Sequence, residues 1–197
     1  LIGRAQAFYN YAAELEGKDR TADDLAYRRN ERQYYNNLLV EMPNGNFADT
    51  IARQLYVSVY EYYFFMSLQN SKDETFAGLA AKTLKEVKYH MTHAADWVVR
   101  LGDGTEESHD KMQQAINDLW MYTGELFDTD ETDNILSEQG IGVDSQSLQS
   151  LWEIHISEVL EEATAGKGVH RFDFDGRYAY LSATTEGYVG NIVVILD

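Results

Sequence analysis

Apolar residues recur every three or four positions through most of the first 164 residues, which is the spacing of amphipathic helices. The pattern predicts a helix up to Gly17, a short helix from Thr21 to about Tyr27, and long helices over about 46–69, 73–101, 103–127 and 145–162. Long amphipathic helices joined by short turns pack as antiparallel bundles. The sequence therefore predicts an all-α helical bundle over residues 1–165.

Polar residues mark several of the predicted helix ends. Thr21 with Asp24, and Asp103 with Glu106, have the spacing of a capping box. Residues 28–45 lack a sustained helical pattern and are predicted to form a long ordered connection. The helical pattern of the first segment begins without a capping residue before it. We therefore expect the bundle to be incomplete at its N-terminal side.

The pattern changes at Gly166. Residues 169–181 alternate between apolar and polar positions, Asp175 and Gly176 form a tight-turn signal, and residues 192–196 are a continuous aliphatic run. This predicts a β-rich tail over residues 166–197, separate from the bundle and of an origin that the sequence leaves open. So short a piece cannot bury a core of its own, so it must pack on the bundle, pair with another chain or belong to a different protein context.

The chain is strongly acidic, with 16 Lys and Arg, 33 Asp and Glu, and a formal net charge of −17. This charge repels phosphate backbones and anionic membranes, so neither nucleic acid nor a membrane is an expected partner, and a basic protein fits better. The absence of cysteine excludes disulfides, iron–sulfur clusters and thiol nucleophiles. No apolar run approaches the roughly 18 residues that span a bilayer, and no leader is evident, so we expect a cytoplasmic protein.

A helical bundle without cysteine suits a carboxylate-bridged di-iron site, which takes Glu from two helices and a Glu-x-x-His pair from each of two others. Glu106 and His109 have this spacing, but they lie in the first turn of a predicted helix, where acidic residues usually face solvent. Glu86 and His90 lie in the middle of the 73–101 helix and border its apolar face. They either bind a metal or form a buried hydrogen-bonded pair, and we favour the pair.

Glu125, Glu61 and Asp49 are the other candidate carboxylates on neighbouring helices. Glu61 lies among aromatic residues, so it is a metal ligand, a buried acid paired with a base, or a solvent-facing group. A second His at ligand spacing is missing, because His155 follows Glu153 by two positions and lies on a different face. The ligand count falls short of a di-iron site, so we expect neither a metal nor catalytic residues in this chain.

Arg28, Arg29 and Arg32 form the main basic cluster, and they are interleaved with polar and aromatic residues. Guanidinium groups suit the recognition of carboxylates and phosphates. The cluster is therefore a candidate contact for a protein partner or for a CoA phosphate, although local salt bridges with the many acids are favoured. No glycine-rich phosphate loop and no nucleophile elbow occur in the sequence.

Several strings resemble the C subunits of the phenylacetyl-CoA 1,2-epoxidase (phenylacetate-CoA oxygenase) complex. They are RNERQY at 29–34, LLVEMPNGNFADTIARQ at 38–54, KEVKYH at 85–90, KMQQAIN at 111–117 and ELFD at 125–128, with YAAEL at 11–15 matching the end of that family's second helix. The resemblance covers residues 1 to about 165. That family has a further N-terminal helix and a different ending after about Gly168.

The resemblance implies a ferritin-like fold and a role in aerobic phenylacetate degradation. In such complexes a sister A subunit holds the di-iron centre that epoxidises the aromatic ring, and the C subunit is its structural partner. By this resemblance Glu86, His90 and Glu125 are remnants of an ancestral metal-site region. The implied partners are the catalytic A subunit and, indirectly, other subunits including the reductase. The resemblance implies no cofactor in this chain.

Two other functions compete with the structural subunit. The chain could be a di-iron carboxylate oxygenase or oxidase in its own right, which requires iron ligands from Glu86, His90, Glu125 and either Glu61 or Asp49. It could also be an interaction module whose β tail recruits a partner by strand addition.

Overall fold

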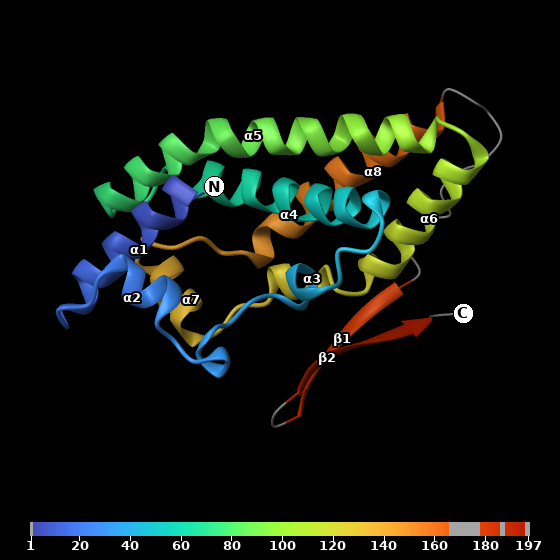
Figure 1. Cartoon of the computed structure of the whole chain (residues 1–197). Coiled ribbons are helices and arrows are strands. Elements are labelled where there is room, and N and C mark those ends of the chain that lie inside the picture. Colours follow the sequence, from blue (N-terminus) through green and yellow to red (C-terminus); the bar gives the residue numbers. More distant parts are fainter. Residues whose placement is uncertain (1, 166–177, 186–187, 196–197) are drawn as a thin grey trace.

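A computed structural model of the chain describes residues 2–165, 178–185 and 188–195. The helices of this part form a bundle whose long members lie side by side (Figure 1). The α-helices are α1 (Ile2–Glu16), α2 (Ala22–Tyr27), α3 (Leu38–Glu41), α4 (Phe47–Leu68), α5 (Glu74–Gly102), α6 (Glu106–Trp120), α7 (Glu131–Glu138) and α8 (Gln149–Ala165). Short 3-10 helices are η1 (Glu31–Gln33), η2 (Gly124–Phe127) and η3 (Gln146–Leu148). The predicted all-α bundle is confirmed.

The core lies where α4 packs against α5, α6 and α8. Its largest fully buried side chain is Trp152 on α8, which is 1% exposed. The indole Nε1 of Trp152 donates a hydrogen bond to the carbonyl oxygen of Tyr56 on α4 at 2.9 Å. The hydroxyl of Tyr56 donates in turn to the carbonyl oxygen of Ile116 on α6 at 3.2 Å. Both buried polar groups are thus satisfied, and they tie three helices together.

Local capping explains several of the helix ends. Thr21 and Asp24 form the predicted capping box of α2, and Asn46 caps α4 through a hydrogen bond from the Ala48 amide at 2.7 Å. Gly17 follows α1 with a φ of +64°, a conformation that glycine adopts without steric cost. The predicted helices up to Gly17 and over 46–69 and 73–101 are confirmed within a residue or two.

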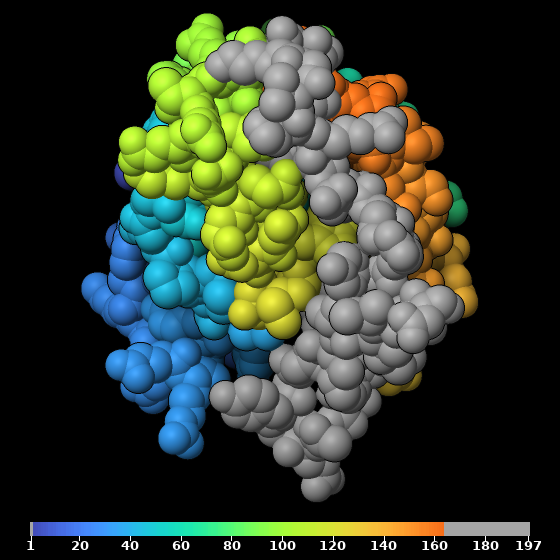
Figure 2. All heavy atoms as spheres, turned by 90° about the vertical axis from the view of Figure 1, so that its right-hand side faces the viewer, coloured from blue at the N-terminus to red at the C-terminus, as the bar shows by residue number. Residues whose placement is uncertain are grey.

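The predicted helix over 103–127 is wrong at both ends. Asp103 closes α5, because its amide donates to the Val99 carbonyl at 2.9 Å, and Thr105 caps α6 by accepting from the Ser108 amide at 3.2 Å. At the other end α6 stops at Trp120, and the chain turns into η2. Figure 2 views this end of the bundle, where α6 and the residues after it, lime to yellow, lie between the cyan α3–α4 segment and the orange α8.

Three short elements were not predicted, namely η1, α3 and α7. The first two lie inside the expected connection over 28–45. Helix α7 begins at a capping box made by Asp130 and Asp133, and none of its residues is buried. After it, the backbone amide of Lys72 donates to the Gly140 carbonyl at 2.9 Å, and the Ser71 hydroxyl donates to the Ile141 carbonyl at 2.7 Å. These bonds join the loop after α7 to the turn between α4 and α5.

Two strands follow the bundle, β1 (Tyr178–Thr185) and β2 (Tyr188–Ile195), which pair antiparallel with Tyr178 opposite Ile195. Residues 166–177, 186–187 and 196–197 of the predicted β tail lie outside the described residues. The division of the chain at residue 165 therefore stays a prediction. None of the described helices combines the length and apolar character that a bilayer crossing requires.

Candidate functional site

Glu86 and His90 lie one turn apart on α5 and contact each other. The Nε2 atom of His90 is 3.6 Å from the Oε1 atom of Glu86, and their side chains are 25% and 36% exposed. This separation allows electrostatic attraction but exceeds hydrogen-bonding distance. The pair therefore sits at the edge of the bundle, at an intermediate depth, and not in the apolar core.

Glu61 on α4 is held by Arg4 on α1. The two guanidinium nitrogens of Arg4 donate to the two carboxylate oxygens of Glu61 at 2.9 and 3.0 Å. The side chains are only 16% and 25% exposed, and the guanidinium also lies 5.7 Å from the ring centroid of Phe65. Of the three roles left open for Glu61, this geometry selects an acid paired with a base. Sequence reasoning missed Arg4, because no local pattern links it to a residue 57 positions away.

Glu125 lies in η2 and contacts the residues at the start of α3. Its Oε2 atom accepts a hydrogen bond from the Leu38 amide at 2.6 Å, and its carbonyl accepts from Asn37 Nδ2 at 3.3 Å. Partial burial raises the pKa of Glu125, and the bond from the Leu38 amide opposes that rise. Among the described residues, Glu125 does not join Glu86 and His90 in a group that could hold a metal ion.

Asp49 is also used locally. Its Oδ2 atom accepts from the Asn46 amide at 2.7 Å and completes the capping box of α4. Among the described residues, no three His, Asp or Glu side chains come together in a way that could hold a metal ion. A di-iron site needs carboxylates from four helices converging with two histidines. The His, Asp and Glu side chains of the described residues therefore do not fit a di-iron centre.

Two further histidines have structural partners. His155 on α8 lies with its Nδ1 atom 3.1 Å from the hydroxyl of Tyr63 on α4, and burial lowers the pKa of His155. His109 on α6, the candidate of the Glu-x-x-His spacing, has its Nδ1 atom 2.9 Å from the carbonyl oxygen of Gly102. Both imidazoles therefore link neighbouring segments of the bundle.

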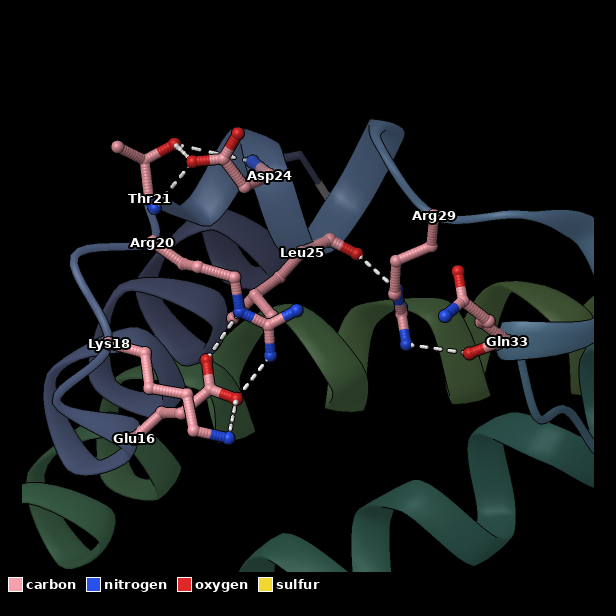
Figure 3. A network of polar contacts seen from close by, with 8 residues as sticks. All are labelled: Glu16, Lys18, Arg20, Thr21, Asp24, Leu25, Arg29 and Gln33. Atoms are coloured by element: carbon pink, nitrogen blue, oxygen red, sulfur yellow. Dashed lines mark hydrogen bonds and ion pairs between the residues drawn. The ribbon is translucent and has the colours of Figure 1, made fainter.

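The arginine cluster is largely engaged in local contacts, and Figure 3 draws those of Arg29. Arg28 pairs with Asp24 at 2.9 Å. Arg29 donates to the Leu25 carbonyl at 2.6 Å and to the Gln33 carbonyl at 2.9 Å. Its guanidinium also lies 4.3 Å from the ring centroid of Tyr34. Arg32 is exposed, and no partner for it occurs among the residues that the structure describes.

Comparison with known proteins shows the family to which the chain belongs. Residues 1–181 match the family described as phenylacetic acid catabolic protein. The chain is also similar to the C subunit of the 1,2-phenylacetyl-CoA epoxidase of Escherichia coli (strain K12), with 50% identity over 164 residues. That alignment covers 83% of this chain and 66% of the relative, so the chain spans slightly less than two thirds of the relative's length. The helical bundle, the matching strings and these similarities together show that the chain belongs to the phenylacetic acid catabolic protein family.

Proposed function

We propose that the chain is a structural, non-catalytic subunit of a phenylacetyl-CoA epoxidase, and that it supports a catalytic subunit which holds the di-iron centre. The similarity to the C subunit of such an enzyme supports this role. The proposal includes a ferritin-like arrangement of the bundle, with which its long packed helices agree. It also holds that this chain itself binds no cofactor.

The proposal that the chain is non-catalytic rests on the contacts that its candidate carboxylates already make. The Arg4 guanidinium neutralises Glu61, and Glu125 accepts a hydrogen bond from the Leu38 amide at the start of α3. Asp49 accepts from the Asn46 amide and completes the capping box of α4. A carboxylate that already binds a cation or a backbone amide is not available to bridge two iron ions without rearrangement. Glu86 and His90 alone supply too few ligands for a di-iron site.

Iron analysis of the separate and assembled proteins tests the proposal. The chain is expressed with excess iron, alone and together with the catalytic subunit, and each preparation is assayed for iron and for epoxidation of phenylacetyl-CoA. We expect almost no iron in the chain alone, and both iron and turnover in the complex. About two irons per folded chain, with turnover in the absence of the catalytic subunit, would instead identify a di-iron oxygenase in its own right.

Substitution of Glu86 and His90 tests the same point within the complex. Because the pair is partly exposed, Glu86→Gln and His90→Ala should each lower the free energy of unfolding by no more than about 1 kcal/mol. Turnover by the assembled complex should stay at the wild-type level. Lost turnover in a complex that still assembles would mean that these side chains take part in the chemistry.

A further inference from the structure

The outward side of α5 carries a continuous line of exposed residues. We call it the outer face of α5, and it consists of Lys82, Lys85, Tyr89, His93, Asp96 and Arg100. These positions follow one another at spacings of three and four, so they share one side of the helix. The opposite side is buried in the bundle. Helix α5 runs along an edge of the molecule in Figure 1.

The charge of this face reverses that of the whole chain. Its charged residues are three bases, Lys82, Lys85 and Arg100, and one acid, Asp96. The chain as a whole has 16 basic and 33 acidic residues. Within the described part of the chain, Lys82 and Lys85 form no ion pair with any acid. Their charges are therefore available to a carboxylate outside the bundle.

The same face exposes the ring of Tyr89, and a partly buried tryptophan lies beside it. Tyr89 is 65% exposed, and its ring lies at an angle of 18° to that of His93 with centroids 6.0 Å apart. Trp97, beside this face, contacts Phe47 edge to face with centroids 5.0 Å apart, although Phe47 is 51% exposed. The guanidinium of Arg100 lies 5.4 Å from the Trp97 ring. Tyrosine, tryptophan and arginine are the residue types that contribute most to binding at protein interfaces.

The arginine cluster of residues 28–32 fits a docking role less well. Arg28 and Arg29 already have local partners, which a docked protein would have to displace. On the outer face of α5 a long regular helix fixes the spacing of the side chains. Lys82 and Lys85 have no ion-pair partner among the described residues that a docked protein would have to displace, so this face is the better-suited surface.

We propose that the outer face of α5 is the surface through which the chain docks on the catalytic subunit of the epoxidase, and that it meets a carboxylate-rich patch there with an apolar recess for Tyr89. This inference rests on the function proposed above. The occupant follows from charge complementarity, because the acidic remainder of the chain repels a carboxylate-rich surface while Lys82 and Lys85 attract it. The net charge of −17 also opposes a second copy of the chain as the occupant.

Binding of purified variants to the catalytic subunit tests the inference, with association and dissociation rates measured at low and high salt. Tyr89→Ala should weaken binding at least about tenfold, mainly through faster dissociation, whereas Tyr89→Phe should retain most of the affinity. The double variant Lys82→Glu/Lys85→Glu should slow association at low salt. The control Lys18→Glu/Lys111→Glu makes the same change in net charge outside α5, removes one exposed ion pair at each position, and should bind like the wild type.

The outcomes separate the two proposals. If the wild-type chain does not bind the catalytic subunit, the proposed function fails. If the wild type binds and the Tyr89 and Lys82/Lys85 variants bind equally well, the docking surface is refuted while the function stands. Sedimentation of each chain alone identifies the competing occupant: a wild-type dimer that Tyr89→Ala converts to a monomer would assign the face to a second copy and overturn the inference. All substituted side chains are exposed, and circular dichroism checks that each variant is folded.

Discussion

The pair of Arg4 and Glu61 shows how one polar contact settles the role of a residue. A carboxylate among aromatic side chains is costly unless a partner compensates for its lost hydration. Arg4 supplies two parallel hydrogen bonds and a cation beside the Phe65 ring. Such a pair contributes little net stability, yet breaking it leaves one charge partly buried and uncompensated. The contact therefore ties α1 to α4.

A double-mutant cycle on this pair gives the first prediction. Arg4→Met and Glu61→Gln should each lower the free energy of unfolding by about 1–3 kcal/mol, because each leaves a polar partner unsatisfied. The double variant should lose less than the sum of the two, since neither charge remains. Urea denaturation measures all four proteins. Strictly additive losses would show that the two side chains do not interact in solution.

His155 predicts a pH dependence of stability. Burial lowers its pKa in the folded state, so around pH 6.5 the unfolded state binds more protons than the folded state. The stability that depends on neutral His155 is complete above that pH and is lost as the pH falls through it. The unfolding free energy of His155→Gln, measured by denaturant titration from about pH 7.5 to about 5.5, should fall less than that of the wild type. The same titration of His93→Gln, which removes an exposed imidazole, is the control.

Sequence reasoning found the polar residues of the site but not their partners. It identified Glu61 and Glu125 as candidates because carboxylates in helices are conspicuous against an apolar pattern. It could not assign Arg4 to Glu61, or the Leu38 amide to Glu125, because these contacts join segments 57 and 87 positions apart. Such pairings depend on helix packing and chain direction, which no local spacing encodes. The salt bridge of Arg28 with Asp24, four positions apart, agrees with the expectation that the arginine cluster pairs with nearby acids.

At the scale of the elements, the sequence predicts the long helices more accurately than the short ones. Helices α4 and α5 show many turns of a single apolar pattern, and their ends carry clear capping residues. The short elements α3 and α7 have too few residues for a periodic pattern to emerge. The end of α6 was misplaced because Leu126 and Phe127 continue the apolar spacing although they lie in η2. Tertiary packing buries these two side chains without a helix.

Helix α7 gives a prediction about its own cap. Asp130 accepts a hydrogen bond from the Asp133 amide at 2.9 Å, and loss of an N-cap side chain costs a helix about 1 kcal/mol. Because α7 buries none of its residues, Asp130→Ala should increase hydrogen exchange of the α7 amides while changing global unfolding by no more than that amount. Asp130→Asn keeps the acceptor and should exchange like the wild type. Equal exchange in Asp130→Ala would show that the cap does not limit local opening.

At the scale of the whole molecule, the fold class follows from the spacing of apolar residues, and its charge follows from composition. The surface that the molecule presents to partners does not follow from either property, because the exposure of a residue depends on which side of each helix the bundle covers. Tyr89 and Trp97 look alike as apolar positions in the sequence, yet Tyr89 is largely exposed and Trp97 packs on the core. The outer face of α5 could be recognised only once the buried side of that helix was known.

The bonds that join the loop after α7 to the turn between α4 and α5 have a consequence for cleavage of the chain. The loop is held at Gly140 and Ile141, and α8 beyond it packs against α4 and α5, while α7 itself contributes nothing to the core. A glutamate-specific protease should therefore cut first after Glu131 or Glu138. The two fragments should co-elute in gel filtration as a native-like pair, and separate elution would contradict this. The chain can then be produced as two complementary halves that reassemble into one bundle, with new chain ends at α7 for attaching probes.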